Sequence, residues 1–272
     1  MGSATVTTPR KVTQPESASG AAAVAARLSD VSVRFKRPGG GITTALDRVS
    51  LELREGELLV FVGRSGCGKT TALNVLAGLV QPSEGAATIL GKTPVAARID
   101  LGYMFARDAL LPWRSAKQNV EFGLELRGID KAERRKRTLH YLELVHLQDY
   151  VGNFPTQLSQ GQRQRVALAR TWALSARVLL MDEPFAALDA QTREALQAEF
   201  LRVWALEKRS VAFVTHDLNE AICLADRILV FTDGRIAREF IVPFQRPRDI
   251  FEITANPEAQ AMYREIRDIL AD

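Results

Sequence analysis

The chain has few of the residues that mark small secreted proteins or zinc proteins. Its 272 residues include only two cysteines, Cys67 and Cys223, and three histidines. Two cysteines so far apart fit neither a disulfide framework nor the paired spacing of a zinc site. No run reaches the roughly 18 apolar residues that a membrane-spanning helix needs. The sequence therefore predicts neither a disulfide-stapled domain nor a membrane pore.

The excess of positive over negative charge is also small. The composition, 46% hydrophobic and 25% charged, is ordinary for a globular domain, and the net charge is only +4. The one dense basic run, Lys131 to Arg137, precedes a helical stripe of Leu139, Leu142 and Val145. No aromatic residues interleave with it for base stacking. We interpret the run as a solvated helix face and expect no nucleic-acid partner.

A phosphate-binding loop is the most informative feature that is present. The apolar strand pattern Leu58 to Val62 leads into G-x-x-x-x-G-K-[ST], and an amphipathic helix with Leu73 and Leu76 follows. Glycines in such a loop let backbone N–H groups converge beside the positive end of the helix, a geometry suited to polyphosphate. The predicted nucleotide-binding residues are Gly63, Arg64, Ser65, Gly66, Cys67, Gly68, Lys69, Thr70 and Thr71.

Two further strand patterns end in acidic or imidazole side chains. A buried run ends in Asp182 and Glu183, and the run Val211 to Thr215 is followed by His216. Because the carboxyl ends of parallel strands meet at one edge of a sheet, we expect these residues beside the loop. Thr70 and Asp182 are then candidate Mg²⁺ ligands, Lys69 contacts the β- and γ-phosphates, and Glu183 orients or deprotonates the attacking water. His216 is expected to donate to a phosphate oxygen, and ATP with Mg²⁺ is the predicted ligand pair.

The order of these motifs resembles the ATP-binding cassette (ABC) ATPases, over residues 28–240. The segment Leu158-Ser159-Gln160-Gly161-Gln162 is similar to the family's LSGGQ signature, with one glycine replaced by glutamine. The resemblance implies that Ser159, Gly161 and Gln162 contact the γ-phosphate held by a partner subunit, in a head-to-tail homodimer. It also implies a D-loop at Asp189, a switch histidine at His216 and an adenine-stacking aromatic at Phe35; an aromatic ending a strand is otherwise a core residue.

The segment Leu110-Leu111-Pro112-Trp113 is similar to the subgroup that imports nitrate, sulfonates and taurine. In that subgroup a glutamine precedes this segment, helping to bind Mg²⁺ and the attacking water and sensing the permease; here Ala106 occupies its position. An alanine offers Mg²⁺ no oxygen, so either water completes the shell or Asp108 supplies an oxygen. For the activity we consider a slower or differently gated hydrolysis and, as the alternative, a water that substitutes at little cost.

The expected fold is α/β: a P-loop NTPase (RecA-like) core with an antiparallel β subdomain and an inserted helical subdomain. We expect a disordered N-terminal tail over 1–26 and an ABC ATPase domain over 27–240, with its helical subdomain at about 106–174. A C-terminal tail over 241–272 should carry a short helix near Ala259 to Leu270. Within the domain, Leu28 to Phe35 and Val49 to Leu53 should be antiparallel strands, and a hairpin should turn at Asp233-Gly234.

The leading functional hypothesis is an ATPase at the cytoplasmic face of the membrane that powers a separate permease. Uptake of a small anionic solute with the help of a solute-binding protein follows from the resemblance alone. A soluble ABC ATPase acting on ribosomes or DNA is the alternative, although such relatives usually carry two cassettes or long coiled coils. A P-loop kinase or GTPase is a third hypothesis, disfavoured by the segment after Leu158 and by the placement of His216.

Overall fold

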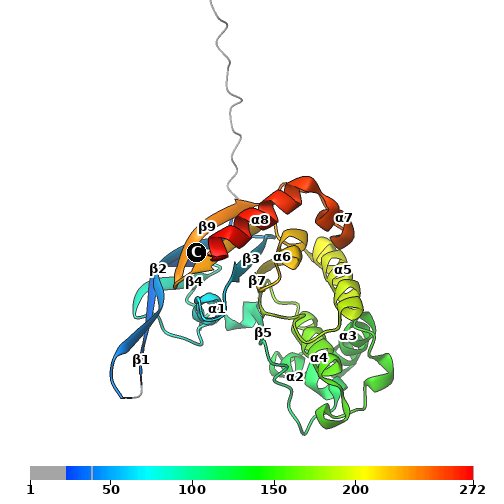
Figure 1. Cartoon of the computed structure of the whole chain (residues 1–272). Coiled ribbons are helices and arrows are strands. Elements are labelled where there is room, and N and C mark those ends of the chain that lie inside the picture. The colour runs from blue at the N-terminus through cyan, green and yellow to red at the C-terminus, as the bar shows by residue number, and fades with distance from the viewer. Residues whose placement is uncertain (1–22, 38, 272) are drawn as a thin grey trace, which may run out of the picture.

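The computed structural model describes residues 23–37 and 39–271, so residues 1–22 of the predicted tail lie outside the described residues. Strands and helices alternate over residues 58–89 and 178–232, and three α-helices lie in the segment between them (Figure 1). The strands are β1 (Val24–Lys36), β2 (Ile42–Arg54), β3 (Leu58–Gly63), β4 (Glu84–Ile89), β5 (Leu101–Met104), β6 (Val178–Asp182), β7 (Ser210–Val214), β8 (Arg227–Thr232) and β9 (Arg235–Ile241). The helices are α1 (Lys69–Leu76), α2 (Ala116–Leu126), α3 (Lys131–Leu144), α4 (Gln160–Ala173), α5 (Ala190–Glu207), α6 (Leu218–Leu224), α7 (Ile250–Ala255) and α8 (Pro257–Ala271).

A six-stranded sheet forms the centre of the molecule, in the order β5-β6-β7-β3-β8-β9. Its strands are parallel except for β9, which pairs antiparallel with β8 through the predicted turn at Asp233-Gly234. Every residue of β3, β6 and β7 is buried. Such continuous apolar strands need cover on both faces, which the two hydrophobic clusters of the core supply. The arrangement brings the ends of β3, β6 and β7 to one edge.

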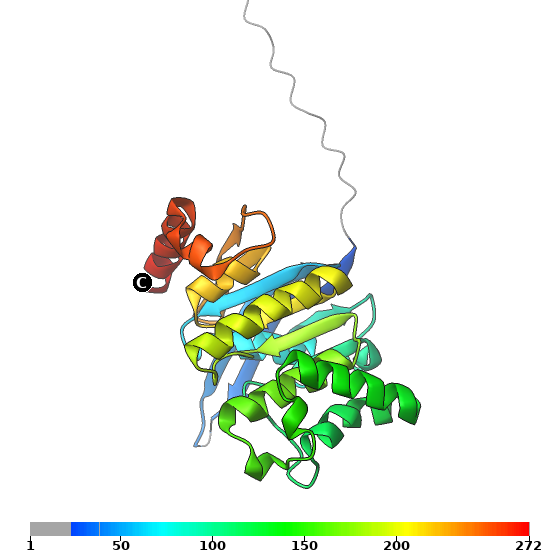
Figure 2. The same ribbon diagram turned by 90° about the vertical axis from the view of Figure 1, so that its right-hand side faces the viewer.

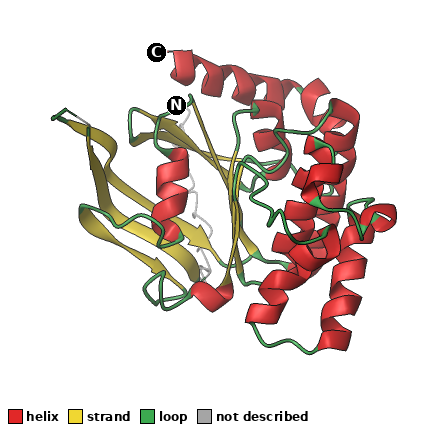
Figure 3. Ribbon diagram, turned by 90° about the horizontal axis from the view of Figure 1, so that it is seen from below, coloured by secondary structure: helices red, strands yellow, loops and turns green. Residues whose placement is uncertain are grey.

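A second sheet of three antiparallel strands, β2-β1-β4, packs across one face. Helix α1 lies between the two sheets and buries Ala72, Leu73 and Leu76 (Figure 3). Strand β1 begins at Val24, because Val24 pairs with Arg54 and Ala26 pairs with both Leu53 and Ile89. The prediction that the tail extends through Ala26 is therefore wrong at residues 24–26, which are ordered by pairing with distant segments.

Helices α2, α3 and α4 pack together beside β5 in the predicted helical region. Two of them start with a capping box, in which a serine hydroxyl accepts from a backbone N–H three residues on: Ser115 for α2 and Ser159 for α4. The basic run lies in the first turns of α3, with Lys131, Arg135 and Lys136 exposed. This placement agrees with the predicted solvated helix face.

The C-terminal segment forms two helices where one was predicted. Helices α7 and α8 fold back so that α8 packs on α6 and β8, with Ile266 fully buried. In Figure 2 they lie at the end of the six-stranded sheet opposite the helical subdomain. Among the described residues, none of the helices combines the length and the apolar character that crossing a membrane requires.

Candidate nucleotide site

The loop between β3 and α1 has a backbone that only glycine allows at key points. Gly68, immediately before α1, has φ = 109°, and a Cβ there would lie 2.6 Å from the carbonyl oxygen of Ala45. The N–H of Gly234 donates to the carbonyl of Cys67 at 3.1 Å. The β8–β9 turn and β2 therefore hold the predicted phosphate loop from outside, with the N-terminus of α1 behind it.

Lys69 is the charged centre of this loop. Its side chain is 6% exposed, and Nζ donates to the carbonyl oxygens of Gly63 (2.7 Å) and Arg64 (3.0 Å). A buried ammonium that bridges the loop is positioned to meet anionic oxygens bound there, because few competing waters reach it. The thiol of Cys67 lies 3.7 Å from Nζ, and both Cys67 and Cys223 are free and buried.

The residues predicted to hold Mg²⁺ do come together. The Thr70 hydroxyl donates to Asp182 Oδ1 at 3.1 Å, joining the start of α1 to the end of β6. Burial raises the pKa of Asp182, whereas the Thr70 hydrogen bond and the Lys69 charge favour the ionised carboxylate. A hard dication fits this pair of oxygen ligands, since Mg²⁺ in such sites takes one or two protein oxygens and completes its shell with phosphate and water.

Glu183 and His216 face each other at the same edge. Glu183 has a left-handed backbone (φ = 46°), and its N–H donates to the carbonyl of Val214 at 3.0 Å. Its Oε2 lies 3.4 Å from His216 Nδ1, and the imidazole is 64% exposed. The left-handed φ of this non-glycine residue costs some energy, and it accompanies a carboxylate that faces the imidazole across the edge. The carboxylate can therefore act on a water molecule while the imidazole meets a phosphate from the open side.

The residues of the signature-like segment lie elsewhere. Ser159 caps α4 and exchanges hydrogen bonds with Gln162, and Asp189 caps α5 by accepting from the Thr192 N–H, which lowers the pKa of Asp189. Within the described part of the chain, no hydrogen bond joins this group to the phosphate loop. A Cβ on Gly161 would meet Leu188 at 3.5 Å, so the segment packs against the D-loop of its own chain. Their roles in ATP binding remain predictions.

Phe35, near the end of β1, is 45% exposed. A core aromatic would be buried, so the alternative of a packed strand-end residue does not hold. An exposed ring on the β subdomain is available to stack on a base, and the adenine-stacking role stays a prediction.

The structure bears on the two explanations for Ala106. The Asp108 carboxylate accepts from Arg163 Nε at 2.8 Å, and Arg170 donates to the backbone carbonyls of Asp108 and Ala109. These contacts hold Asp108 against α4, in the helical subdomain. An Mg²⁺ ligand from Asp108 would have to break the Arg163 pair, so water is the better candidate to complete the shell.

We expect Ala106→Gln to raise the ATP turnover number several-fold, because an amide oxygen at this position adds a fixed ligand for Mg²⁺ and the attacking water. The measurement is steady-state phosphate release at saturating MgATP. Ala109→Gln, three residues further along the same segment, is the matched control. Turnover of Ala106→Gln no faster than the parent would show that water substitutes at little cost.

Sequence reasoning missed two residues that lie behind Glu183 and His216. They line a cavity of about 30 Å³ together with Thr215. Glu220 on α6 is only 4% exposed, and its Oε1 accepts from Gln197 Nε2 at 2.7 Å. Arg193 on α5 donates to the Leu188 carbonyl at 2.9 Å and lies 3.9 Å from Asp217. The available signal was the charge of Glu220 immediately before the apolar run Ala221 to Leu224.

Burial raises the pKa of Glu220 from 4.5 to about 7, against opposing hydrogen bonds from Thr215 and Gln197. The unfolded chain therefore loses this proton first, and the free energy of unfolding falls as pH rises from 4.5 to about 7. Glu220→Gln stays neutral, so we expect it to be more stable than the parent at pH 8 by up to about 3 kcal/mol. The difference should shrink towards pH 5, as measured by chemical denaturation.

Glu194→Gln, the same change at a half-buried position of α5, is the control. A Glu220→Gln chain less stable than the parent at pH 8 would contradict the assignment of a neutral buried carboxyl.

The phosphate loop, the Thr70–Asp182 pair and the Glu183–His216 pair on a parallel sheet define a P-loop ATPase. Comparison with known proteins gives the family. The ABC transporter family model matches residues 46–186, and an uncharacterised ABC transporter ATP-binding protein of Methanocaldococcus jannaschii is 47% identical over 212 residues, 77% of this chain and 79% of the relative. The chain belongs to the ABC transporter ATP-binding family.

Other relatives carry a more specific name. The taurine import ATP-binding protein TauB of Rhizobium johnstonii is 40% identical over 250 residues, 90% of this chain and 95% of TauB. A solved dimer of the ATP-binding cassette MJ0796 with ADP and Pi superposes with a TM-score of 0.74 at 34% identity, covering 81% of this chain and all of that one. The predicted fold class, the ATPase activity and the use of ATP with Mg²⁺ are confirmed.

Proposed function

We propose that this chain is the energy-supplying subunit of an importer for a small anionic solute such as taurine, another sulfonate or nitrate. The carrying observation is the match to TauB, which runs over 90% of this chain and 95% of the relative. Because the match extends over nearly the whole relative, the proposal rests on more than a shared ATPase core. The proposed place of work is the cytoplasmic face of the membrane, with a solute-binding protein elsewhere in the system.

The proposed permease contact is the segment around Trp113. Trp113 is 71% exposed, although the segment that carries it is held firmly: the Asn119 amide donates to the carbonyls of Leu111 and Arg114, and its oxygen accepts from the Leu111 N–H at 2.8 Å. Leu110 packs on the core beneath. A rigidly held, exposed tryptophan is typical of an interface anchor, because little conformational entropy is lost when it is covered.

The proposed working unit is a head-to-tail homodimer. Among the described residues, the predicted signature residues Ser159, Gly161 and Gln162 make no hydrogen bond to the phosphate loop, and they begin α4 with N–H groups and a positive helix end. In the proposal they meet the γ-phosphate held by the partner. The MJ0796 cassette bound to ADP and Pi is a dimer, which supports the dimeric state in this proposal.

In the proposed reaction, Lys69 and the loop N–H groups bind the phosphates and hold the γ-phosphorus in place. Glu183 accepts the proton of the attacking water, and His216 donates to a γ-phosphate oxygen as negative charge redistributes. Thr70 and Asp182 hold Mg²⁺, which neutralises phosphate charge when bound. Hydrolysis then opens the dimer, and the segment at Trp113 passes that motion to the permease.

The test is an affinity pull-down from gently solubilised native membranes, using the Glu183→Gln chain with ATP, followed by mass spectrometry. We expect a multi-spanning permease to be retained, and to be lost in a Glu183→Gln/Trp113→Ala chain that still binds ATP. Leu206→Ala, which removes an equally exposed apolar side chain from α5, is the matched control. Recovery of only ribosomal, DNA-bound or soluble partners would contradict the transporter role and favour the alternative of a soluble ABC ATPase.

A further inference from the structure

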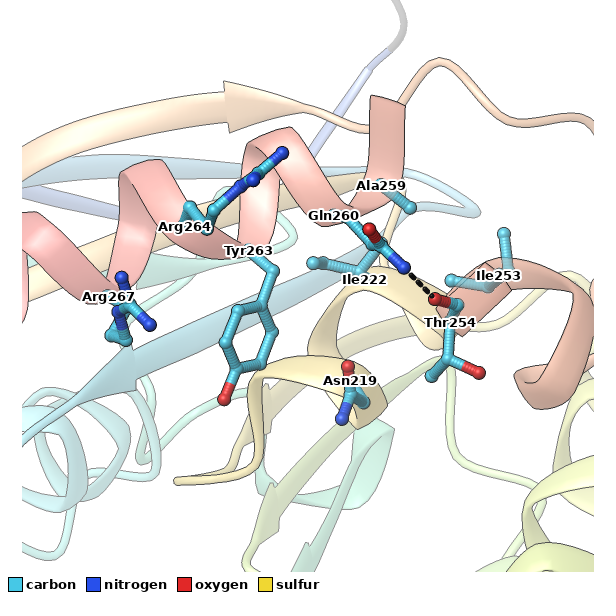
Figure 4. A pocket seen from close by; sticks show the side chains of 9 residues that line it. All are labelled: Asn219, Ile222, Ile253, Thr254, Ala259, Gln260, Tyr263, Arg264 and Arg267. Atoms are coloured by element: carbon cyan, nitrogen blue, oxygen red, sulfur yellow. Dashed lines mark hydrogen bonds between the residues drawn. The ribbon is translucent and has the colours of Figure 1, made fainter. Parts of the chain in front are cut away.

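A groove of about 350 Å³ separates the C-terminal helices from α6. Its floor is apolar, formed by Ile222 of α6 and Ile253 of α7. In Figure 4, Tyr263 reaches from α8 towards Asn219 of α6, Arg267 lies one turn along the same helix, and the Arg264 side chain lies across α8. Both arginines belong to the lining of the groove. The groove thus combines an apolar surface with neutral and cationic hydrogen-bond donors.

The charged side chains that line this groove are positive. Its described lining contains two arginines and no carboxylate. Arg264 has no ion pair among the described residues, and Arg267 pairs only with its chain neighbour Asp268, at 3.2 Å with both side chains mostly exposed. An exposed pair of this kind contributes little and is readily exchanged for another anion. Guanidinium groups suit a carboxylate or sulfonate, which can accept two N–H bonds at once.

Both walls of the groove end at the nucleotide site. Helix α6 starts directly after His216, and Asp217 caps it by accepting from the Asn219 N–H at 2.9 Å. Helix α8 ends at the phosphate loop, where Arg64 donates to the carbonyl of Ala271 at 2.8 Å. A cation at the negative end of a helix stabilises that contact. A ligand that joins α6 to α8 therefore touches two elements that carry residues of the ATP site.

We propose that the groove binds a small organic anion, with its sulfonate or carboxylate group on Arg264 and Arg267 and its apolar part on Ile222 and Ile253. We further propose that this binding alters ATP affinity through α6 and the Arg64–Ala271 contact. The inference concerns a site distinct from the nucleotide site, and it does not depend on which solute the permease carries. A failed permease pull-down would leave it standing, and its own failure would leave the ATPase role untouched.

The binding test is a calorimetric and NMR titration of the Glu183→Gln chain with 1-butanesulfonate, in the presence of saturating MgATP so that the phosphate loop is occupied. We expect a Kd of roughly 0.1 to 1 mM, in the range that two charge-assisted contacts support. Arg264→Gln/Arg267→Gln should weaken it at least about tenfold. Lys131→Gln, which removes an exposed charge from α3, should leave it unchanged. Amide shifts should concentrate on α6 and α8.

Inorganic phosphate and 1-butanol are the other probes. If phosphate binds as tightly as butanesulfonate, the ligand is an inorganic rather than an organic anion. If butanol binds equally well, the site is only an apolar groove. Either result overturns the proposed ligand class. No binding at about 10 mM, or unchanged binding in the double arginine variant whose circular dichroism and ATP affinity match the parent, overturns the site itself.

The coupling has its own measurement. Thermodynamic linkage requires that butanesulfonate change the Kd for ATP by the same factor by which ATP changes the Kd for butanesulfonate. We expect a factor of about three or more, reduced towards one in Arg64→Gln, which loses the contact to α8. Equal ATP affinity with and without the sulfonate would overturn the coupling, and full mutual exclusion would place the sulfonate on the phosphate loop instead.

Discussion

Replacing Glu183 by glutamine should lower ATP turnover by about 10²- to 10⁴-fold while ATP still binds, because the amide cannot accept the proton of the attacking water. The side chain keeps its size, and the backbone bond from Glu183 to Val214 is unaffected. The loss should therefore fall on the chemical step, as a drop in kcat with little change in the affinity for MgATP. Phosphate release and equilibrium binding of a fluorescent ATP analogue measure the two quantities.

Glu194→Gln makes the same chemical change one helix away and should retain full turnover. A second informative variant is His216→Ala. It should lower turnover, because it removes the imidazole that lies 3.4 Å from the Glu183 carboxylate. If Glu183→Gln hydrolyses ATP at the parent rate, the general base is another group. Asp182 is then excluded as the base only if the turnover of Asp182→Asn no longer depends on Mg²⁺. An equal loss in Glu194→Gln would show that the effect is a general one on the fold.

The grouping of Lys69, Thr70, Asp182, Glu183 and His216 was predictable because each lies in a segment that follows a buried strand. Gly63, Asp182 and Thr215 end or follow β3, β6 and β7, and adjacent parallel strands bring such positions to one edge whatever the details of packing. The glycine pattern then identifies one of the three ends as a phosphate loop. Local sequence and a general rule of sheet topology were sufficient for this part of the molecule.

Features that depend on distant contacts were not predictable. Val24 to Ala26 have the composition of a tail and become strand only by pairing with residues 54 and 89. The local sequence indicates no partner for Asp108, whereas in the structure its carboxylate accepts a hydrogen bond from Arg163. The Arg64–Ala271 contact spans 207 residues, and the buried Glu220 accepts a hydrogen bond from Gln197, 23 residues earlier in the chain. No window of local sequence contains these partners.

Replacing Lys69 by alanine should weaken MgATP binding by about 10- to 100-fold or more, since each hydrogen bond from a charged donor to a phosphate contributes about 1.5 to 3 kcal/mol. Because Nζ also bonds the Gly63 and Arg64 carbonyls, the variant should lose some stability without nucleotide as well. The two effects separate in thermal unfolding: ATP raises the midpoint of the parent by mass action, and that rise should nearly vanish in the variant. Lys92→Ala, at an exposed lysine 4.0 Å from Asp100, should keep the full rise. An unchanged ATP-dependent rise in Lys69→Ala would mean that backbone N–H groups alone hold the phosphates, and the buried ammonium would then be a structural tie of the loop.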